Sequence, residues 1–168
     1  MSRAFVKEAD GADEALPERP VSVHPNYVTA AGLAALKARL NELLAGKSAL
    51  EGCEDLSAKQ QLQSLERDLR YFSERIETAI AVDPKAQVKG EVHFGATITV
   101  ADANDLKQTF VIVGEDEADI GAGKIGWTSP LAEALIGGRV GDEVMWKRPT
   151  GDVELEIIAI EYPDAEAS

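Results

Sequence analysis

The chain has 168 residues, of which 45 % are hydrophobic and 28 % are charged, and its formal net charge is −13. This length and apolar content suit one or two small domains with a real core. The single cysteine, Cys53, excludes an internal disulfide framework and a cysteine metal cluster. No segment approaches the roughly 20 apolar residues of a membrane span, and the charged start of the chain is atypical of a signal peptide. We therefore expect a cytoplasmic protein that does not enter a membrane.

Residues 1–26 are expected to form a disordered or extended leader. They combine acidic residues and alanine with Pro17, Pro20 and Pro25, and their hydrophobic residues follow no period. Such a composition does not support a packed core.

Residues 27–83 are predicted to form an antiparallel coiled-coil hairpin. On both arms, apolar residues recur at steps of three and four, the period of two helices that share one narrow seam. The first arm carries Leu33, Leu36, Leu40, Leu43 and Leu50, and the second carries Leu62, Leu65, Leu69, Phe72, Ile76 and Ala79. Because such a hairpin closes its own seam, we expect a monomer.

The ends of the two helices also have sequence signals. Thr29 fits the N-cap of a first helix that runs to about Glu51, and Gly52 fits the left-handed residue after it. Ser57 fits the capping box of a second helix that ends before Pro84.

Three acids, Glu51, Glu54 and Asp55, crowd the turn between these helices. Carboxylates suit a hard cation such as Mg²⁺, but so few cannot hold the ion alone, so the groups of another macromolecule would complete the site. Alternatively, the acids only keep the turn soluble and cap the second helix. Cys53 lies among them, where acidic neighbours disfavour a reactive thiolate.

The second arm carries three arginines, Arg67, Arg70 and Arg75, with Tyr71 between them. Their long side chains can simply cover the seam of the coiled coil. The alternative is that they contact RNA or an acidic groove of another protein.

Charge is unevenly distributed along the chain. Residues 28–82 contain seven basic and eight acidic residues, whereas residues 83–168 contain seven basic and seventeen acidic residues. The acidic field of the second region repels phosphate backbones, so autonomous DNA binding is not expected.

Residues 84–168 are predicted to form a second domain, because the hydrophobic period changes to two from about Glu91. The expected strands cover residues 91–100, 109–113, 124–127, 143–147 and 153–160. Residues 114–119 are expected to form an acidic loop. Ser129 and Pro130 suit the start of a helix over residues 131–136. A small sheet with one helix packed across it makes the whole chain an α+β protein.

Conventional enzyme chemistry has no support in the sequence. His24 lies in the leader and His93 in an expected strand, and no nucleophile is suitably spaced from either. There is no phosphate loop or dinucleotide motif, since the glycines at 121 and 123 are not followed by a helix.

Several segments resemble, in order and spacing, the carboxy-terminal domain of the GreA/GreB transcription elongation factors. They are FGATITV at 94–100, IVGEDEAD at 112–119, SPLAEALIG at 129–137, VGDEV at 140–144 and IAIEY at 158–162. VTAAGL at 28–33 is similar to the start of the family's hairpin. The resemblance therefore covers everything except the leader.

This resemblance implies that residues 84–168 form an FKBP-like antiparallel sheet with one helix, which docks at the rim of the secondary channel of bacterial RNA polymerase. The coiled coil would enter the channel, where Asp55, Glu54 and Glu51 would act in the polymerase active site. Asp55 and Glu54 would share a Mg²⁺ ion with the polymerase, and no cofactor would be bound alone. The polymerase would then hydrolyse a backtracked transcript near its 3′ end by two-metal chemistry. The factor would be an accessory and not itself an enzyme.

Two further sets of residues follow from the same resemblance. A face that binds the polymerase is expected to include Asp116, Ser129, Pro130, Leu131 and Leu135. Arg67, Arg70 and Arg75 are expected near the nascent RNA.

Two features depart from the family pattern. The family has an aspartate followed three residues later by a glutamate; Asp55 matches the first, but Ala58 occupies the second position, so Glu54 or Glu51 would substitute. Each arm is also about one heptad shorter, a loss of roughly 10 Å of reach at 1.5 Å per residue.

From the resemblance, cleavage stimulation is the first hypothesis. Because of the two departures, a non-cleaving channel regulator is the alternative. The alternative resembles the regulator of nucleoside diphosphate kinase or the anti-Gre factors. A prolyl isomerase or chaperone is the third reading, and it needs an aromatic-lined pocket. Phe94, Phe110, Trp127 and Trp146 are instead expected in the core.

Overall fold

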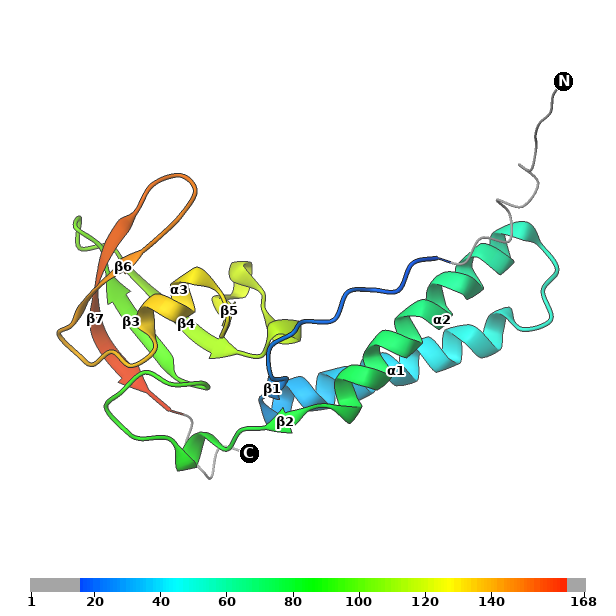
Figure 1. Cartoon of the computed structure of the whole chain (residues 1–168), viewed down its shortest axis with the longest axis horizontal. Coiled ribbons are helices and arrows are strands. Elements are labelled where there is room, and N and C mark those ends of the chain that lie inside the picture. Colours follow the sequence, from blue (N-terminus) through cyan, green and yellow to red (C-terminus); the bar gives the residue numbers. More distant parts are fainter. Residues whose placement is uncertain (1–15, 163–168) are drawn as a thin grey trace, which may run out of the picture. The chain divides into compact units, whose positions relative to one another are not determined.

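The computed structural model describes residues 16–162, and these group into two compact units (Figure 1). Among these residues, the hairpin unit contains residues 16–21 and Leu36–Glu77, and the sheet unit contains Ser22–Ala35 and residues 78–162. The division after Glu77 lies a few residues before the expected boundary at residue 83. Residues 16–26 of the expected leader contain no helix or strand, and residues 1–15 lie outside the described part.

The hairpin consists of helices α1 (Ala30–Leu50) and α2 (Leu56–Glu77). The predicted N-cap is confirmed, because the Thr29 hydroxyl accepts a hydrogen bond from the Gly32 amide at 2.9 Å. Gly52, with a φ of 85°, ends α1 as predicted. The prediction for Ser57 is wrong, since α2 already begins at Leu56. The Asp55 carbonyl accepts the first helical bond, from the Lys59 amide at 3.0 Å, which places Asp55 at the N-cap.

The seam of the hairpin is only partly buried. Leu36 and Leu43 of α1 are 5 % and 2 % exposed, and Ala58 of α2 is 8 % exposed. The apolar positions predicted on α2 are half-buried, because a pair of helices has no third layer to cover them. The apolar residues spaced three and four apart therefore located the seam correctly.

In the sheet unit, a short parallel pair joins β1 (Tyr27–Val28) to β2 (Ile80–Ala81). The main sheet has the order β5-β4-β3-β7-β6. Its strands are β3 (Thr97–Ala101), β4 (Lys107–Val113), β5 (Lys124–Gly126), β6 (Glu143–Trp146) and β7 (Val153–Glu161). The sheet is mixed and not purely antiparallel as expected, because β5 runs parallel to β4. Residues 114–123 allow this, since they are long enough to return the chain to the same end of the sheet.

A single hydrophobic core lies between this sheet and α3 (Pro130–Leu135), which begins and ends close to the predicted residues. Ile98, Ile112, Leu135 and Ile157 are fully buried there. The core assignment of the aromatic residues is confirmed. Phe110 is buried in this cluster, and Phe94, Trp127 and Trp146 pack against it.

The strand expected over 91–100 begins only at Thr97, so its first half was predicted wrongly. Val92 is fully buried, but it lies in a loop whose backbone pairs with Gly137 and Gly138 at 2.8 and 2.9 Å. Gly95 has a φ of 90°, which turns the chain before β3. His93 is therefore a loop residue and not a strand residue. Hydrophobic residues alternate in this segment without forming a strand, and this alternation led to the wrong prediction.

The acidic segment 114–119 is structured through Glu117. One carboxylate oxygen of Glu117 accepts the amides of Thr29 and Gly114, each at 3.1 Å, and the other oxygen bonds the Thr29 hydroxyl. At Gly32, a Cβ atom would overlap this carboxylate, and at Gly114 it would overlap the Tyr27 carbonyl. Glycine at these positions lets the Glu117 carboxylate reach the first turn of α1.

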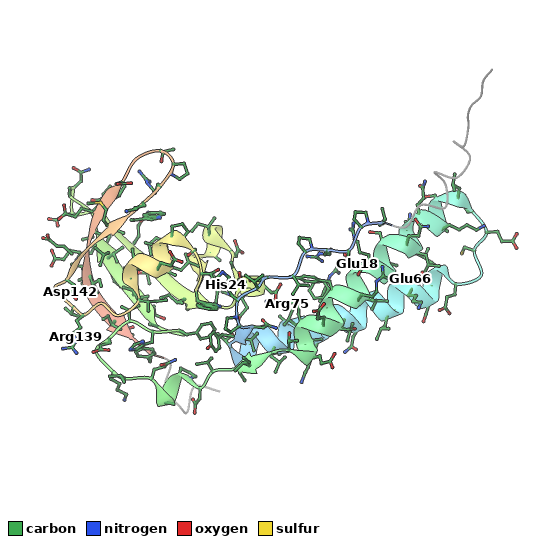
Figure 2. All side chains as sticks on the ribbon, in the orientation of Figure 1. Glu18, His24, Glu66, Arg75, Arg139 and Asp142 are labelled. Atoms are coloured by element: carbon green, nitrogen blue, oxygen red, sulfur yellow. The ribbon has the colours of Figure 1, made fainter. Side chains whose placement is uncertain are left out.

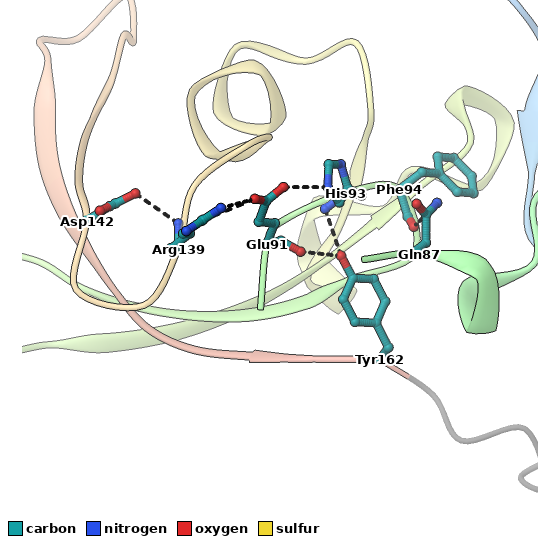
Figure 3. A network of polar contacts seen from close by, with 7 residues as sticks. All are labelled: Gln87, Glu91, His93, Phe94, Arg139, Asp142 and Tyr162. Carbon is teal, nitrogen blue, oxygen red and sulfur yellow. Dashed lines mark hydrogen bonds and ion pairs between the residues drawn. The ribbon is translucent and has the colours of Figure 1, made fainter. Parts of the chain in front are cut away.

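A polar network fixes the loop before β3 to the end of β7. Arg139 and Asp142, labelled in Figure 2, lie at one end, where the Arg139 amide donates to Asp142 at 2.9 Å. Figure 3 shows the Arg139 guanidinium on the Glu91 carboxylate, whose other oxygen lies 3.2 Å from His93 Nε2. The Tyr162 hydroxyl donates to the Glu91 carbonyl and accepts from the His93 amide at 2.9 Å. The Arg139 hydrogen bond, and then that of His93, lowers the pKa of Glu91.

Glu117→Ala should lower the free energy of unfolding of the sheet unit by about 1–3 kcal/mol, because two backbone amides lose their acceptor. Urea unfolding followed by tryptophan fluorescence measures this unit, since both tryptophans, Trp127 and Trp146, lie in it. Glu133→Ala removes an exposed acid from α3 and should cost at most about 1 kcal/mol. Equal losses for the two variants would contradict the role given to Glu117.

Glu91→Gln should reduce the acid sensitivity of the sheet unit. A lowered pKa means that ionised Glu91 stabilises the folded chain above the ordinary glutamate value of 4.5, and that this contribution is lost as the pH falls through the lowered pKa. The parent should therefore be more stable than Glu91→Gln at pH 7, and the difference should disappear in strong acid. Urea midpoints from pH 7 to pH 3 test this, and a difference that stays constant with pH would refute it.

Candidate functional site

The candidate tip site is the five-residue turn between α1 and α2. Its three acids, Glu51, Glu54 and Asp55, are all exposed, as is Cys53. The structure thus brings the three predicted carboxylates into one short turn. Within residues 16–162, however, no group of three or more His, Cys, Asp or Glu side chains could hold a metal ion. The tip offers carboxylates to a cation held partly by another molecule, and it is not a complete site by itself.

Position 58, three residues after Asp55, supplies no carboxylate to the tip, because it is alanine. Ala58 is 8 % exposed and lies in the first turn of α2, on the side that faces the seam. Additional acidic ligands at the tip can therefore come only from the turn itself.

The three arginines of α2 have different environments. Arg75 is 2 % exposed, so it is a buried residue of the hairpin. Arg67 is half-buried, and its Nε lies 3.7 Å from an oxygen of Asp68. Arg70 is exposed and bonds Glu18 of the leader through Nε at 2.9 and 3.0 Å and through Nη2 at 2.7 Å. The basic run is therefore not one continuous exposed patch.

Sequence reasoning missed the leader as part of this region. Arg19 places its guanidinium 3.9 Å from the centre of the Tyr71 ring and bonds Asp68 at 3.4 Å. The Arg70 hydrogen bond lowers the pKa of Glu18, and Glu18 in turn raises the pKa of Arg70. The available signal was charge complementarity, since Glu18 and Arg19 each have an opposite charge available in Arg70 and Asp68.

The residues expected to bind the polymerase fall into two groups. Leu131 and Leu135 are 2 % and 0 % exposed and belong to the core beneath α3. Ser129 caps α3 by accepting the Ala132 amide at 3.3 Å, and Pro130 is exposed. Asp116 is half-buried in the segment that carries Glu117. Pro130, Ser129 and Asp116 are therefore the members of this set that solvent reaches.

An apolar depression lies beside Pro130. It has a volume of about 270 Å³, and its wall includes Ile120, Ile125, Leu131 and Trp146. Ile120 is 68 % exposed, so its apolar side chain is available for contact at this depression. Trp146 is the one aromatic residue of this wall, so the pocket differs from the aromatic-lined pocket that a prolyl isomerase would need.

The surface near β6 and β7 is acidic and not apolar. Asp102, Glu143, Glu154 and Glu156 line a second depression of about 200 Å³. The hydrogen bond and the charge of Glu143 raise the pKa of Glu154. Such a surface repels phosphate backbones.

No helix in residues 16–162 is long and apolar enough to cross a membrane.

Comparison with known proteins identifies the family. Residues 87–162 match the model "Transcription elongation factor, GreA/GreB, C-term". Over 153 residues, the chain is 37 % identical to transcription elongation factor GreB of Neisseria meningitidis, which covers 82 % of this chain and 94 % of that protein. Transcription elongation factor GreA of Hyphomonas neptunium is 37 % identical over 151 residues, which covers 80 % of this chain and 96 % of that protein.

A solved structure is also similar. The crystal structure of GreA factor homolog 1 of Thermus thermophilus matches with a TM-score of 0.40 and 25 % identity, covering 82 % of this chain and 99 % of that chain. On the sequence relatives and the domain match, the chain belongs to the GreA/GreB family of transcription elongation factors.

Proposed function

We propose that this protein binds bacterial RNA polymerase at the secondary channel and promotes cleavage of backtracked transcripts, which relieves arrest. The observation that carries the proposal is the tip: three exposed carboxylates in one five-residue turn that closes a two-helix hairpin. Membership of a transcription elongation factor family supports it. In this proposal, the protein is a cytoplasmic monomer and an accessory to the polymerase's own nuclease.

The chemistry requires only a small contribution from the tip. Mg²⁺ prefers six oxygen ligands, keeps several waters and is typically bound by one or two carboxylates together with phosphate oxygens. In two-metal hydrolysis, the ions activate a water and stabilise the leaving oxygen. Asp55 together with Glu54 or Glu51 would supply the carboxylates, and the polymerase and the nascent RNA 3′ end would supply the other ligands. The exposure of all three acids leaves them accessible to such a partner.

A second candidate function has its own observation. Position 58 is alanine, so α2 offers no second carboxylate three residues after Asp55. A hairpin with an incomplete ligand set would occupy the channel without stimulating cleavage. The protein would then be a non-cleaving regulator that competes with other channel-binding factors.

The sheet unit offers an apolar surface for docking on the polymerase. We place this contact at the depression beside Pro130, where Ile120 is exposed and Asp116 and Ser129 lie at solvent-accessible positions. Leu131 and Leu135 support this surface from the core. Exposed apolar groups rimmed by polar ones are typical of protein–protein contacts.

Asp55→Ala should slow transcript shortening on the order of tenfold or more, because the shared Mg²⁺ would lose a ligand. The assay adds the full chain to stalled, backtracked elongation complexes and follows RNA length over time. Glu42→Ala removes an exposed acid from α1 outside the tip and should match the parent. If Asp55→Ala matches the parent, the metal hypothesis fails. If the parent binds the complexes without shortening the RNA, the non-cleaving function is correct.

Ile120→Ser combined with Pro130→Ala should weaken binding to core polymerase by about three- to tenfold, the loss expected for an apolar contact of this size. Leu106→Ser is the matched control, since Leu106 is 64 % exposed in the same unit but does not line the depression. Affinity is measured by competition with a labelled parent protein. An unchanged affinity would show that the docking surface lies elsewhere.

A further inference from the structure

Two successive leader residues lie on α2 in a defined register. Glu18, labelled beside α2 in Figure 2, receives both Nε and Nη2 of Arg70. Arg19 bonds Asp68 and covers the ring of Tyr71, with its guanidinium carbon 3.9 Å from the ring centre and 5.3 Å from that of Phe72. Both leader residues belong to the same compact unit as α2.

The charges make this register specific. The leader presents an acid followed by a base, and α2 presents the base Arg70 and the acid Asp68 opposite them. A shift by one residue would place Arg19 opposite Arg70, and like charges at that distance repel. The contact is therefore encoded in the sequence and is more than a general attraction between an acidic leader and a basic helix.

We propose that residues 16–21 act as a strap that occupies the Arg70–Tyr71 face of α2 and must leave before this face can bind single-stranded RNA. This inference rests on the proposed function, since it regulates access of RNA to the same hairpin. Arg75 is buried and Arg67 is half-buried, so Arg70 is the most exposed of the three arginines and the one best placed for a phosphate once the strap has left.

The strap occupies both parts of an RNA-like site. The Glu18 carboxylate takes the position of a phosphate on the fork of Arg70, an arrangement that phosphates and carboxylates share. The planar Arg19 guanidinium takes the position of a base on Tyr71, since bases and guanidinium groups both stack on aromatic rings. An acidic peptide would use Arg70 but would leave the aromatic face unexplained, so single-stranded RNA is the favoured partner.

The strength of the contact suits a reversible strap. Glu18 and Arg70 are both exposed, with side-chain exposures of 62 % and 54 %, so water and salt weaken their attraction. A competing phosphate chain of high charge density can displace such a pair. The strap should therefore be closed in the free chain and open when RNA is concentrated near α2.

The decisive variant is Arg19→Ala in the full chain. It removes a positive charge, so simple electrostatics predicts weaker binding of RNA, whereas loss of the strap predicts tighter binding. We expect the dissociation constant of a fluorescent ten-nucleotide oligouridylate, measured by anisotropy at low salt, to fall about three- to tenfold, because the competent fraction rises. Glu18→Gln should have the same effect. Adding Arg70→Gln to either variant should remove the gain.

Matched controls lie on α1, where Arg39 and Glu42 form an exposed pair of the same type. Arg39→Ala and Glu42→Gln change the charge equally but should not tighten RNA binding. Unchanged or weaker binding by Arg19→Ala, including no measurable binding by any variant, would overturn the strap. Tighter binding of a polyglutamate peptide in place of the RNA would also overturn it, in favour of an acidic protein partner.

The outcomes separate this inference from the proposed function. If the cleavage and polymerase-binding assays succeed but Arg19→Ala leaves RNA affinity unchanged, only the strap is refuted. If Arg19→Ala tightens RNA binding but the chain does not bind polymerase, the strap stands and the proposed function fails.

Discussion

The carboxylate of Glu117 is the constraint on which the start of the hairpin depends. It accepts the amides of Thr29 and Gly114, and it lies so close to the first turn of α1 that position 32 must be glycine. The chain that leaves the hairpin returns beside the same place, since the Ile80 amide donates to the Asn26 carbonyl at 2.8 Å. Entry and exit are therefore fixed together within the sheet unit, by one side chain and one short parallel strand pair.

The two units differ in charge. The sheet unit carries most of the negative charge, and near β6 this charge is dense enough to raise the pKa of Glu154. The hairpin is nearly neutral, and several of its charges are paired, as in Glu18–Arg70 and Arg19–Asp68. Such a protein has little general affinity for nucleic acid, so any contact with RNA would depend on a few residues presented at one place.

Local patterns predicted the parts of the structure that depend on neighbours in sequence. The cap at Thr29, the left-handed Gly52 and the helix after Ser129 followed from nearby residues, and the family resemblance supplied the tip and docking candidates. Contacts between distant segments could not be predicted in this way. Tertiary packing, which periodicity does not encode, determines these contacts. They include the parallel pairing of β4 with β5, the pairing of Val92 with Gly137, the burial of Leu131 beneath α3 and the contact of Arg19 with α2.

The tip shows how packing limits chemistry. A hairpin of two helices has one seam, and Ala58 lies on it because it stands one helical turn before the seam residue Leu62. Position 58 therefore contributes a small apolar side chain to the seam and no carboxylate to the tip. The acids available for metal binding are therefore those that the turn itself holds in water. In the proposed function, transcript cleavage therefore requires Glu51 or Glu54 to reach the same ion as Asp55, because α2 supplies no carboxylate at position 58.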